Sequence, residues 1–185
     1  LFLFVQMTWV GALPARDLGD YQGIPWNSRF PVIEHRFPGV DFVEEDSFHV
    51  TLFRLNHPGN GISHIDFKLF EEQLISVTHF YSGPIDQLQN DAFVNRMVNG
   101  LGPRVEERKT TSQGLAGLAN VVIWDYEDNM VLFKSYPPGQ ETGFARKENA
   151  VIFIYKPTFD KMVYFRKHSQ GDNDNQVIDY DYIEF

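Results

Sequence analysis

Apolar and polar residues alternate through much of the chain, and this alternation predicts strands at 47–56, 62–70 and 73–82. A turn-forming sequence, His57-Pro58-Gly59-Asn60-Gly61, joins the first two strands. Glu71-Glu72 lies between the second and the third. Short connections of this kind join antiparallel neighbours, so we expect a three-stranded meander.

The same alternation returns in the second half of the chain. It predicts a strand at 105–111, a hairpin of 120–126 with 130–136, and a last hairpin of 150–156 with 162–167 around 157–160. The acidic segment 41–46 is expected to be a solvent-exposed connection.

Segment 28–37 predicts a short helix. Ser28 is a suitable N-cap, because its hydroxyl can accept a hydrogen bond from a free backbone N–H of the first turn. Pro31 is tolerated in that first turn. Pro38-Gly39 ends the helix, since the residue before a proline avoids the helical region and glycine accepts a left-handed conformation.

Segment 85–101 predicts a second, longer helix. Phe93, Met97 and Leu101 recur at intervals of four and form one apolar stripe, and Gly102-Pro103 ends it. Strands come in runs and do not alternate singly with helices. We therefore predict an α+β fold with an antiparallel sheet and two main helices packed on one face.

A weak internal similarity suggests two helix-plus-hairpin halves. Val43-Glu44-Glu45 follows the end of the first helix, and Val105-Glu106-Glu107 follows the end of the second. Hairpins follow each of these short segments, so the chain order is helix then strands, twice.

The segment from Gly23 to Gly39 begins Gly-Ile-Pro-Trp and leads into the short helix. This start resembles that of small exported bacterial α+β domains of unknown function. Other similar features are Phe70 to Val77, Leu101-Gly102-Pro103 and Val122-Ile123-Trp124-Asp125. Asn27 stands where the resemblance leads us to expect glycine. The resemblance implies export and a fold, and it implies no activity.

The first fifteen residues are expected to be the remnant of a signal peptide. An apolar run ends at Leu13-Pro14-Ala15, which is typical of the second half of such a peptide. An ordinary buried N-terminal strand is the alternative. On the first interpretation, 16–168 is a single domain, 169–185 is a polar linker with a C-terminal strand or tail, and the protein is periplasmic or secreted. The apolar run is too short to span a bilayer, so we expect no membrane span in the mature chain.

Composition excludes several classes of function. The chain has 185 residues, which suits one domain, and its formal net charge is −9, from 25 acidic and 16 basic residues. A nucleic-acid backbone would be repelled, so we expect no nucleic-acid partner. The absence of cysteine excludes disulfides, thiol catalysis and thiolate metal sites.

The sequence His49-Val50-Thr51-Leu52 resembles the His-x-Thr-x signature of two-histidine phosphoesterases. In that family one imidazole acts as base and the other as acid. His64 is the second candidate here, although Asp66 stands where a hydroxyl residue is required. By alternation His64, Asp66 and Lys68 share one face of their strand. The simpler interpretation is that His49 and His64 lie on the solvated face of a sheet.

Two further candidates have equally simple alternatives. Trp26 could be an aromatic platform for a ligand or a plug in the core. Asp172 and Asp174 resemble the start of a calcium loop, but the glycine and the distal glutamate of that loop are missing, so a solvated linker is the alternative. His49, His64 and His79 could bind Zn²⁺ only if they shared a face, which alternation does not favour. We expect no cofactor.

These observations predict an exported, non-enzymatic binding or envelope-accessory protein. Its partner would be a protein or an envelope component, bound at a sheet face or an exposed edge. The alternatives are a phosphoesterase-like hydrolase using His49 and Thr51, and a calcium-dependent module. The oligomeric state is left open.

Overall fold

The computed structural model describes residues 18–81, 87–102, 106–111, 118–136 and 149–169. The expected signal-peptide remnant at 1–15 and the expected linker and tail beyond residue 169 lie outside these ranges, and so does the calcium-loop candidate. In chain order the elements are β1 (Asp20–Tyr21), β2 (Ile24–Pro25), α1 (Phe30–Arg36), β3 (Asp41–Glu45), β4 (Val50–Gly59), β5 (Ile62–Phe70), β6 (Gln73–Tyr81), α2 (Gln87–Leu101), β7 (Glu106–Thr111), β8 (Leu118–Asp125), β9 (Asn129–Ser135), β10 (Asn149–Tyr155) and α3 (Lys156–Ser169).

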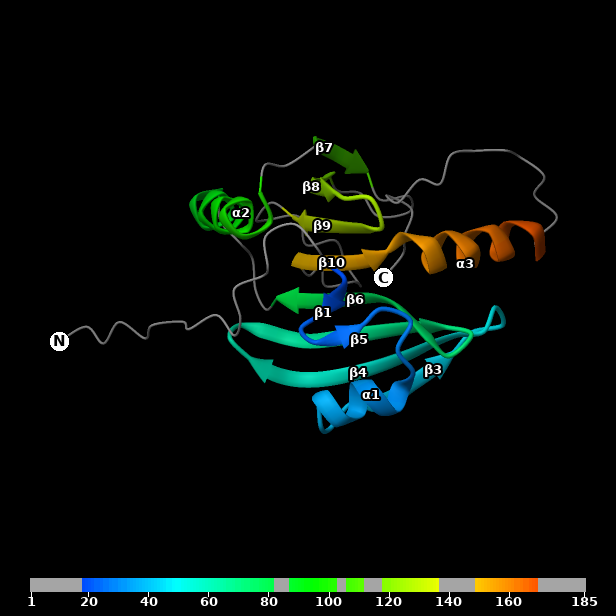
Figure 1. Ribbon diagram of the computed structural model, residues 1–185. Coiled ribbons are helices and arrows are strands. Elements are labelled where there is room, and N and C mark those ends of the chain that lie inside the picture. The colour runs from blue at the N-terminus through cyan, green and yellow to red at the C-terminus, as the bar shows by residue number, and fades with distance from the viewer. Residues whose placement is uncertain (1–17, 82–86, 103–105, 112–117, 137–148, 170–185) are drawn as a thin grey trace.

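One eight-stranded sheet organises the molecule, in the order β3-β4-β5-β6-β10-β9-β8-β7 (Figure 1). Every neighbouring pair in it is antiparallel. The short strands β1 and β2 pair separately. The predicted α+β fold with an antiparallel sheet is therefore confirmed.

The sheet consists of two meanders that meet where β6 pairs with β10. The helix α1 precedes the meander β3 to β6, and α2 precedes the meander β7 to β10. This topology agrees with the two halves expected from the sequence. In each half the helix is followed by four strands, one more than in a three-stranded meander.

The additional strand of the first half corrects one expectation. Residues 41–45 were expected to be a connection, but they form the edge strand β3, which pairs with β4. All five residues of β3 are exposed, including three carboxylates. Sequence alone suggested a solvated loop because edge strands carry the same charged residues.

The two faces of the sheet bury two separate apolar clusters. One cluster contains Ile33 of α1, Phe93 and Met97 of α2, and strand residues such as Phe67. The other contains Phe159 and Met162 of α3 with strand residues such as Ile152 and Leu132. The two predicted helices thus lie on one face, as expected, and α3 lies on the other.

The helix α3 is the second correction. Residues 162–167 were expected to form a strand, but 156–169 are helical. Pro157 lies in the first turn, where it removes no intrahelical hydrogen bond. Phe159 and Met162 are three residues apart and both buried, which is helical and not strand spacing. Valine and aromatic residues in this segment favoured the wrong prediction.

The start of α1 also differs in detail from the prediction. Arg29 is the N-cap residue, and no side chain caps the helix. Ser28 is instead held through its backbone, since its carbonyl accepts a hydrogen bond from Leu74. Pro31 lies in the first turn as predicted. Asn27 has a left-handed backbone (φ 65°), which explains why glycine was expected there.

Candidate functional site

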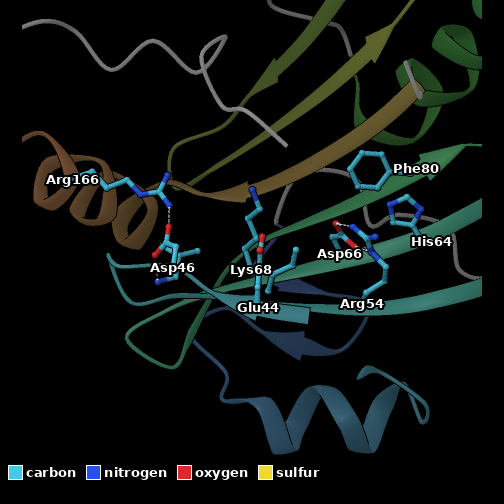
Figure 2. Close-up of a pocket in the computed structure, with 10 residues that line it drawn as sticks. Glu44, Asp46, Arg54, His64, Asp66, Lys68, Phe80 and Arg166 are labelled. Carbon is cyan, nitrogen blue, oxygen red and sulfur yellow. Dashed lines mark hydrogen bonds and ion pairs between the residues drawn. The ribbon is translucent and has the colours of Figure 1, made fainter. Parts of the chain in front are cut away.

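A pocket of ≈ 440 Å³ lies between α3 and the face of the first meander (Figure 2). Most of its lining side chains are charged or polar, although the face continues into an apolar cluster. The lining residues are Glu44, Asp46, Val50, Leu52, Arg54, His64, Asp66, Lys68, Phe80 and Arg166.

Because side chains alternate along a strand, the strand residues that line the pocket project from one face of the sheet. Arg54 is paired with Asp66, and Leu52 with Lys68, so their side chains project to the same side. A bulge in β3 matters here. The register shifts between Phe42 and Glu44, so that Glu44 lies opposite Leu52 and lines the pocket.

Arg54 and Asp66 form a bidentate ion pair. Arg54 Nε donates to Asp66 Oδ1 at 2.6 Å, and Nη2 donates to Oδ2 at 2.7 Å. The Asp66 side chain is only 6% exposed, whereas that of Arg54 is 33% exposed. A paired carboxylate of this kind can be buried, and it fixes the position of the guanidinium above it.

A second ion pair closes the other side of the pocket. Arg166 of α3 donates through Nη2 to Asp46, and its guanidinium lies 5.4 Å from the centre of the Phe48 ring. Asp46 Oδ1 also accepts hydrogen bonds from the backbone N–H groups of Phe48 and Val50, each at 2.9 Å. Burial opposes ionisation of Asp46, but these hydrogen bonds and Arg166 outweigh it and lower its pKa.

Lys68 lies between the two ion pairs (Figure 2). Burial, followed by the positive charge of Arg166, lowers the pKa of Lys68 to about 8. The carboxylates of Asp66, Asp46 and Glu44 act in the opposite direction and do not compensate. A lysine of this kind has a neutral amine within reach of physiological pH.

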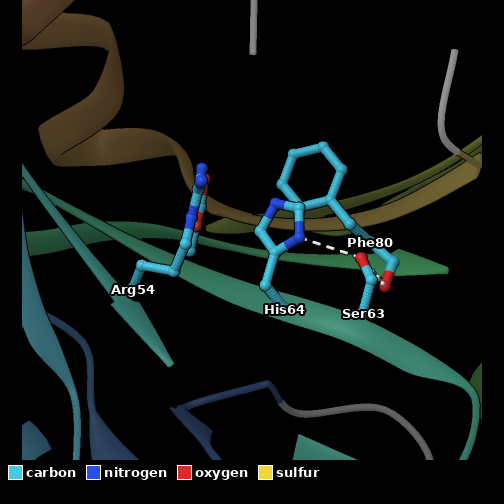
Figure 3. A network of polar contacts seen from close by, with 5 residues as sticks. Arg54, Ser63, His64 and Phe80 are labelled. Carbon is cyan, nitrogen blue, oxygen red and sulfur yellow. Dashed lines mark hydrogen bonds and ion pairs between the residues drawn. The ribbon is translucent and has the colours of Figure 1, made fainter. Parts of the chain in front are cut away.

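Two stacked rings line the pocket beside the charged groups. The ring of His64 is stacked on Phe80, with centroids 4.3 Å apart and planes inclined by 14°. Ser63 Oγ lies 2.8 Å from His64 Nδ1, and it donates to the carbonyl of Phe80 at 3.2 Å (Figure 3). These contacts hold the imidazole in one orientation toward the pocket.

Three buried donors near the pocket have no hydrogen-bond partner among the residues that the structure describes. They are Arg166 Nε, Ser76 Oγ and Thr78 Oγ1. In the sheet, Ser76 pairs with Lys68 and Thr78 with Asp66, so both hydroxyls lie on the pocket face. Buried donors are normally satisfied, so the unpaired Arg166 Nε, whose residue lines the pocket, favours a bound acceptor.

The residues of the phosphoesterase hypothesis do not come together. His64 lines the pocket. Thr51 is paired with Leu69, which belongs to the cluster on the opposite face. His49 precedes β4 in a left-handed conformation (φ 59°), and its exposed ring lies 3.7 Å from Glu45. Thr51 and His64 thus lie on different faces of the sheet, and the structure does not bring them together as two-histidine acid–base chemistry requires.

Trp26 lies in the core. Its side chain belongs to the cluster shared with α1 and α2, its Nε1 donates to the carbonyl of Leu18 at 2.5 Å, and it stacks on Tyr155. Asp172 and Asp174 lie outside the described residues. Within the described ranges, no three His, Asp or Glu side chains are grouped as metal ligands require. His79 is on the opposite face from His64, buried and hydrogen-bonded to the Tyr21 hydroxyl.

Sequence reasoning placed His64, Asp66 and Lys68 on one face, and the pocket confirms this. It missed Arg54 and Arg166. The available signal for Arg54 was a cation in the middle of an otherwise apolar strand. Arg166 could not be found while 162–167 was interpreted as a strand.

Comparisons with known proteins supply no family. No family model matches the chain, and no curated protein matches it. Among solved structures, one match is a cysteine-rich secretory protein from Staphylococcus aureus subsp. aureus Mu50, with 13% identity and a TM-score of 0.40. The match covers 72% of this chain and 44% of that one, so this chain spans less than half of its length. Among the described helices, none has both the length and the apolar composition needed to cross a membrane.

Proposed function

We propose that this protein is a non-enzymatic binding domain that takes a small carboxylate- or phosphate-bearing ligand in the charged pocket. One observation carries the proposal. Arg54, Lys68 and Arg166 come from three different elements and line a single pocket, in a chain whose formal net charge is −9. Glu44, Asp46 and Asp66 line the same pocket, and the three cations are the groups that an anionic ligand would contact.

The unpaired donors support the same ligand class. Arg166 Nε, from a residue that lines the pocket, can donate a hydrogen bond to the ligand, and Ser76 and Thr78 lie beneath the lining residues on the same face. Carboxylates offer only acceptors at neutral pH and phosphates offer mainly acceptors, and hydrogen bonds to charged groups are stronger than neutral ones. A bound anion would also stabilise the ammonium form of Lys68, which burial disfavours.

The acidic groups of the pocket leave room for such a ligand. Asp66 and Asp46 each form an ion pair with an arginine, so these four charges compensate one another, and Lys68 is the further cation of the pocket lining. Val50, Leu52 and Phe80 provide apolar contacts for the rest of the ligand. Ligand pockets combine these features, with a few polar groups fixing the orientation of a mainly apolar contact.

Isothermal titration calorimetry with oxalate and with inorganic phosphate tests the proposal. The wild-type protein should bind at least one of these probes, and Lys68→Met should bind at least about tenfold more weakly, which corresponds to about 1.4 kcal/mol. Arg29→Gln is the matched control, because it removes an exposed cation that pairs with Glu72 outside the pocket. The proposal is wrong if neither probe binds, or if Lys68→Met and Arg29→Gln bind like the wild type.

Export of the domain, and an envelope component as the natural source of the ligand, are proposals that rest on the N-terminal residues and the resemblance. They do not affect the design of the binding experiment. Attachment of the first thirty residues to a reporter enzyme would test export directly, by measuring the reporter's activity outside the cytoplasm.

A further inference from the structure

We propose that Lys68 forms a reversible imine with ligands that carry an aldehyde or ketone next to a carboxylate. This inference rests on the proposed function and deepens it, because it names 2-oxo acids as the ligand class of the pocket. The argument begins from the position of Lys68 between the two arginine ion pairs (Figure 2).

The geometry of a 2-oxo acid matches that position. Its carbonyl carbon is bonded directly to the carboxylate carbon, so a site that binds the carboxylate also fixes the carbonyl. Arg54 and Arg166 flank Lys68 and already bind Asp66 and Asp46, but Arg166 Nε has no described partner and can donate to a ligand carboxylate. A carboxylate held there brings the carbonyl carbon close to Lys68 Nζ, which is the arrangement that proximity catalysis requires.

The amine has the reactivity that the step needs. Only the neutral amine is a nucleophile, and desolvation lowers the pKa of Lys68 to about 8. The charged and titratable groups that face it come from every neighbouring element. They are Arg54 of β4, Asp66 and His64 of β5, Glu44 of β3, Asp46 before β4, and Arg166 of α3.

The step is balanced without an oxidant or a reductant. The Nζ lone pair forms a bond to the carbonyl carbon, and a proton moves from nitrogen to the carbonyl oxygen to give a carbinolamine. The C–O bond then breaks, and the oxygen leaves as water with the second amine proton. The product is an imine between Lys68 and the ligand, and hydrolysis reverses it.

Other described lysines differ from Lys68 in their surroundings. Lys156 donates to Asp125 at 2.9 Å and also to the Tyr126 carbonyl. Lys134 lies 5.9 Å from the ring centre of Tyr136. Neither lines the charged pocket, so both serve as internal controls within the same protein.

Reductive trapping tests the inference. The full chain is incubated with glyoxylate and sodium cyanoborohydride, and the modified lysines are identified by peptide mass spectrometry. Lys68 should be modified at least about tenfold faster than Lys134 or Lys156, because burial keeps part of its amine neutral at about pH 7.5 and the pocket holds the ligand carboxylate beside it. At glyoxylate concentrations far below saturation, where the rate reports the unliganded protein, it should reach half of its maximum near pH 8, the pKa of Lys68.

Two comparisons make the result specific. Acetaldehyde lacks the carboxylate and should show much less preference for Lys68. Lys68→Arg retains the positive charge but cannot form an imine, so its pocket should not be labelled. Modification of Lys68 no faster than Lys134, or with the same preference by acetaldehyde, would overturn the inference.

Oxalate separates this inference from the proposed function. It carries two carboxylates and no aldehyde or ketone, so it can occupy the pocket without forming an imine. Oxalate should slow the trapping of Lys68 by glyoxylate. If oxalate binds in calorimetry but glyoxylate does not label Lys68, the imine is wrong and the binding function stands. If oxalate does not bind and Lys68 is not labelled, both are wrong.

Discussion

The same face of the sheet differs sharply between its two meanders. In the second meander this face is buried and apolar. Its residues are Val121, Ile123, Met130, Leu132, Ala150, Ile152 and Ile154. In the first meander the corresponding face carries Arg54, His64, Asp66, Lys68, Ser76 and Thr78. Both halves are antiparallel meanders of the same sheet.

The difference shows that the fold does not require polar groups on this face. Apolar residues stabilise the second meander through burial, at about 25 cal/mol per Å². Burying charged and hydroxyl groups costs free energy unless each has a partner. The first meander includes a lysine whose ammonium form is disfavoured and two hydroxyl donors, Ser76 and Thr78, without a described partner. These residues favour ligand binding as the reason for the polar half.

The largest expected effect is a loss of stability caused by a substitution in the apolar half of this face. Ile152 is 1% exposed, and Ile152→Ala should lower the free energy of unfolding by about 2–5 kcal/mol, because it removes buried methyl groups and leaves a cavity. Urea denaturation measures this change. Oxalate binding by the folded variant should remain like that of the wild type. A loss of binding as large as that of Lys68→Met would contradict the separation of the two halves.

The next prediction concerns the polar half and alkaline pH. The folded pKa of Lys68 is about 8, below its ordinary value of 10.5, so the unfolded chain holds an additional proton between these values. Stability from this group therefore rises with pH across that window, by about 3 kcal/mol at 1.36 kcal/mol per pKa unit. Lys68→Met should lack this rise and should be more stable than the wild type at pH 7. Denaturation at several pH values measures the difference, and parallel curves would contradict it.

A third prediction concerns His79, which lies on the face opposite the pocket, at acidic pH. Burial lowers the pKa of His79 to about 4, so the unfolded chain takes up a proton first as the pH falls below 6.5. Stability should therefore fall by about 3 kcal/mol between pH 6.5 and 4. His79→Gln should remove this dependence, whereas His35→Gln, at an exposed position, should retain it. An equal slope in both variants would contradict the assignment.

The smallest expected effect comes from a substitution outside both halves of this face. The side chains of Arg29 and Glu72 are each 75% exposed, and their atoms are 3.7 Å apart. Arg29→Gln should change the free energy of unfolding by less than about 0.5 kcal/mol, because exposed ion pairs contribute little. Denaturation in urea provides the value. A loss of several kcal/mol would show that charge pairs outside the pocket also determine stability.

Much of the fold could be predicted from local patterns. The strand at 62–70 was predicted with the bounds that β5 has, because turn residues mark both of its ends. Alternation then placed His64, Asp66 and Lys68 together. Alternation does not hold at Ile75, which lies on the opposite face from Val77 although the two are two residues apart. A register shift near Leu69 places these two residues in different clusters. A bulge of this kind leaves no clear signal in a single sequence.

The pocket itself required information that local patterns do not contain. Asp46 and Arg166 are 120 residues apart, and they meet only because α3 packs on the first meander. Because residues 162–167 were predicted to be a strand, the contact between Arg166 and Asp46 could not be anticipated. His49-Val50-Thr51 had the residue types of an active site, but the opposite orientation of neighbouring strand residues separates Thr51 from His64. Tertiary packing, and not motif spacing, therefore brings the candidate site together.

The measurement that tests the central claim most directly is a titration of the protein with oxalate, followed by the ¹H–¹⁵N signals of the arginine side chains. Arg166 Nε–H is buried and has no partner among the described residues, and Arg54 Nε–H binds Asp66 at the same pocket. If the pocket binds anions, the Arg166 and Arg54 signals should move and saturate together while Arg29 stays unchanged. If Arg166 does not move, or if all arginine signals drift alike with salt, the pocket is not an anion-binding site.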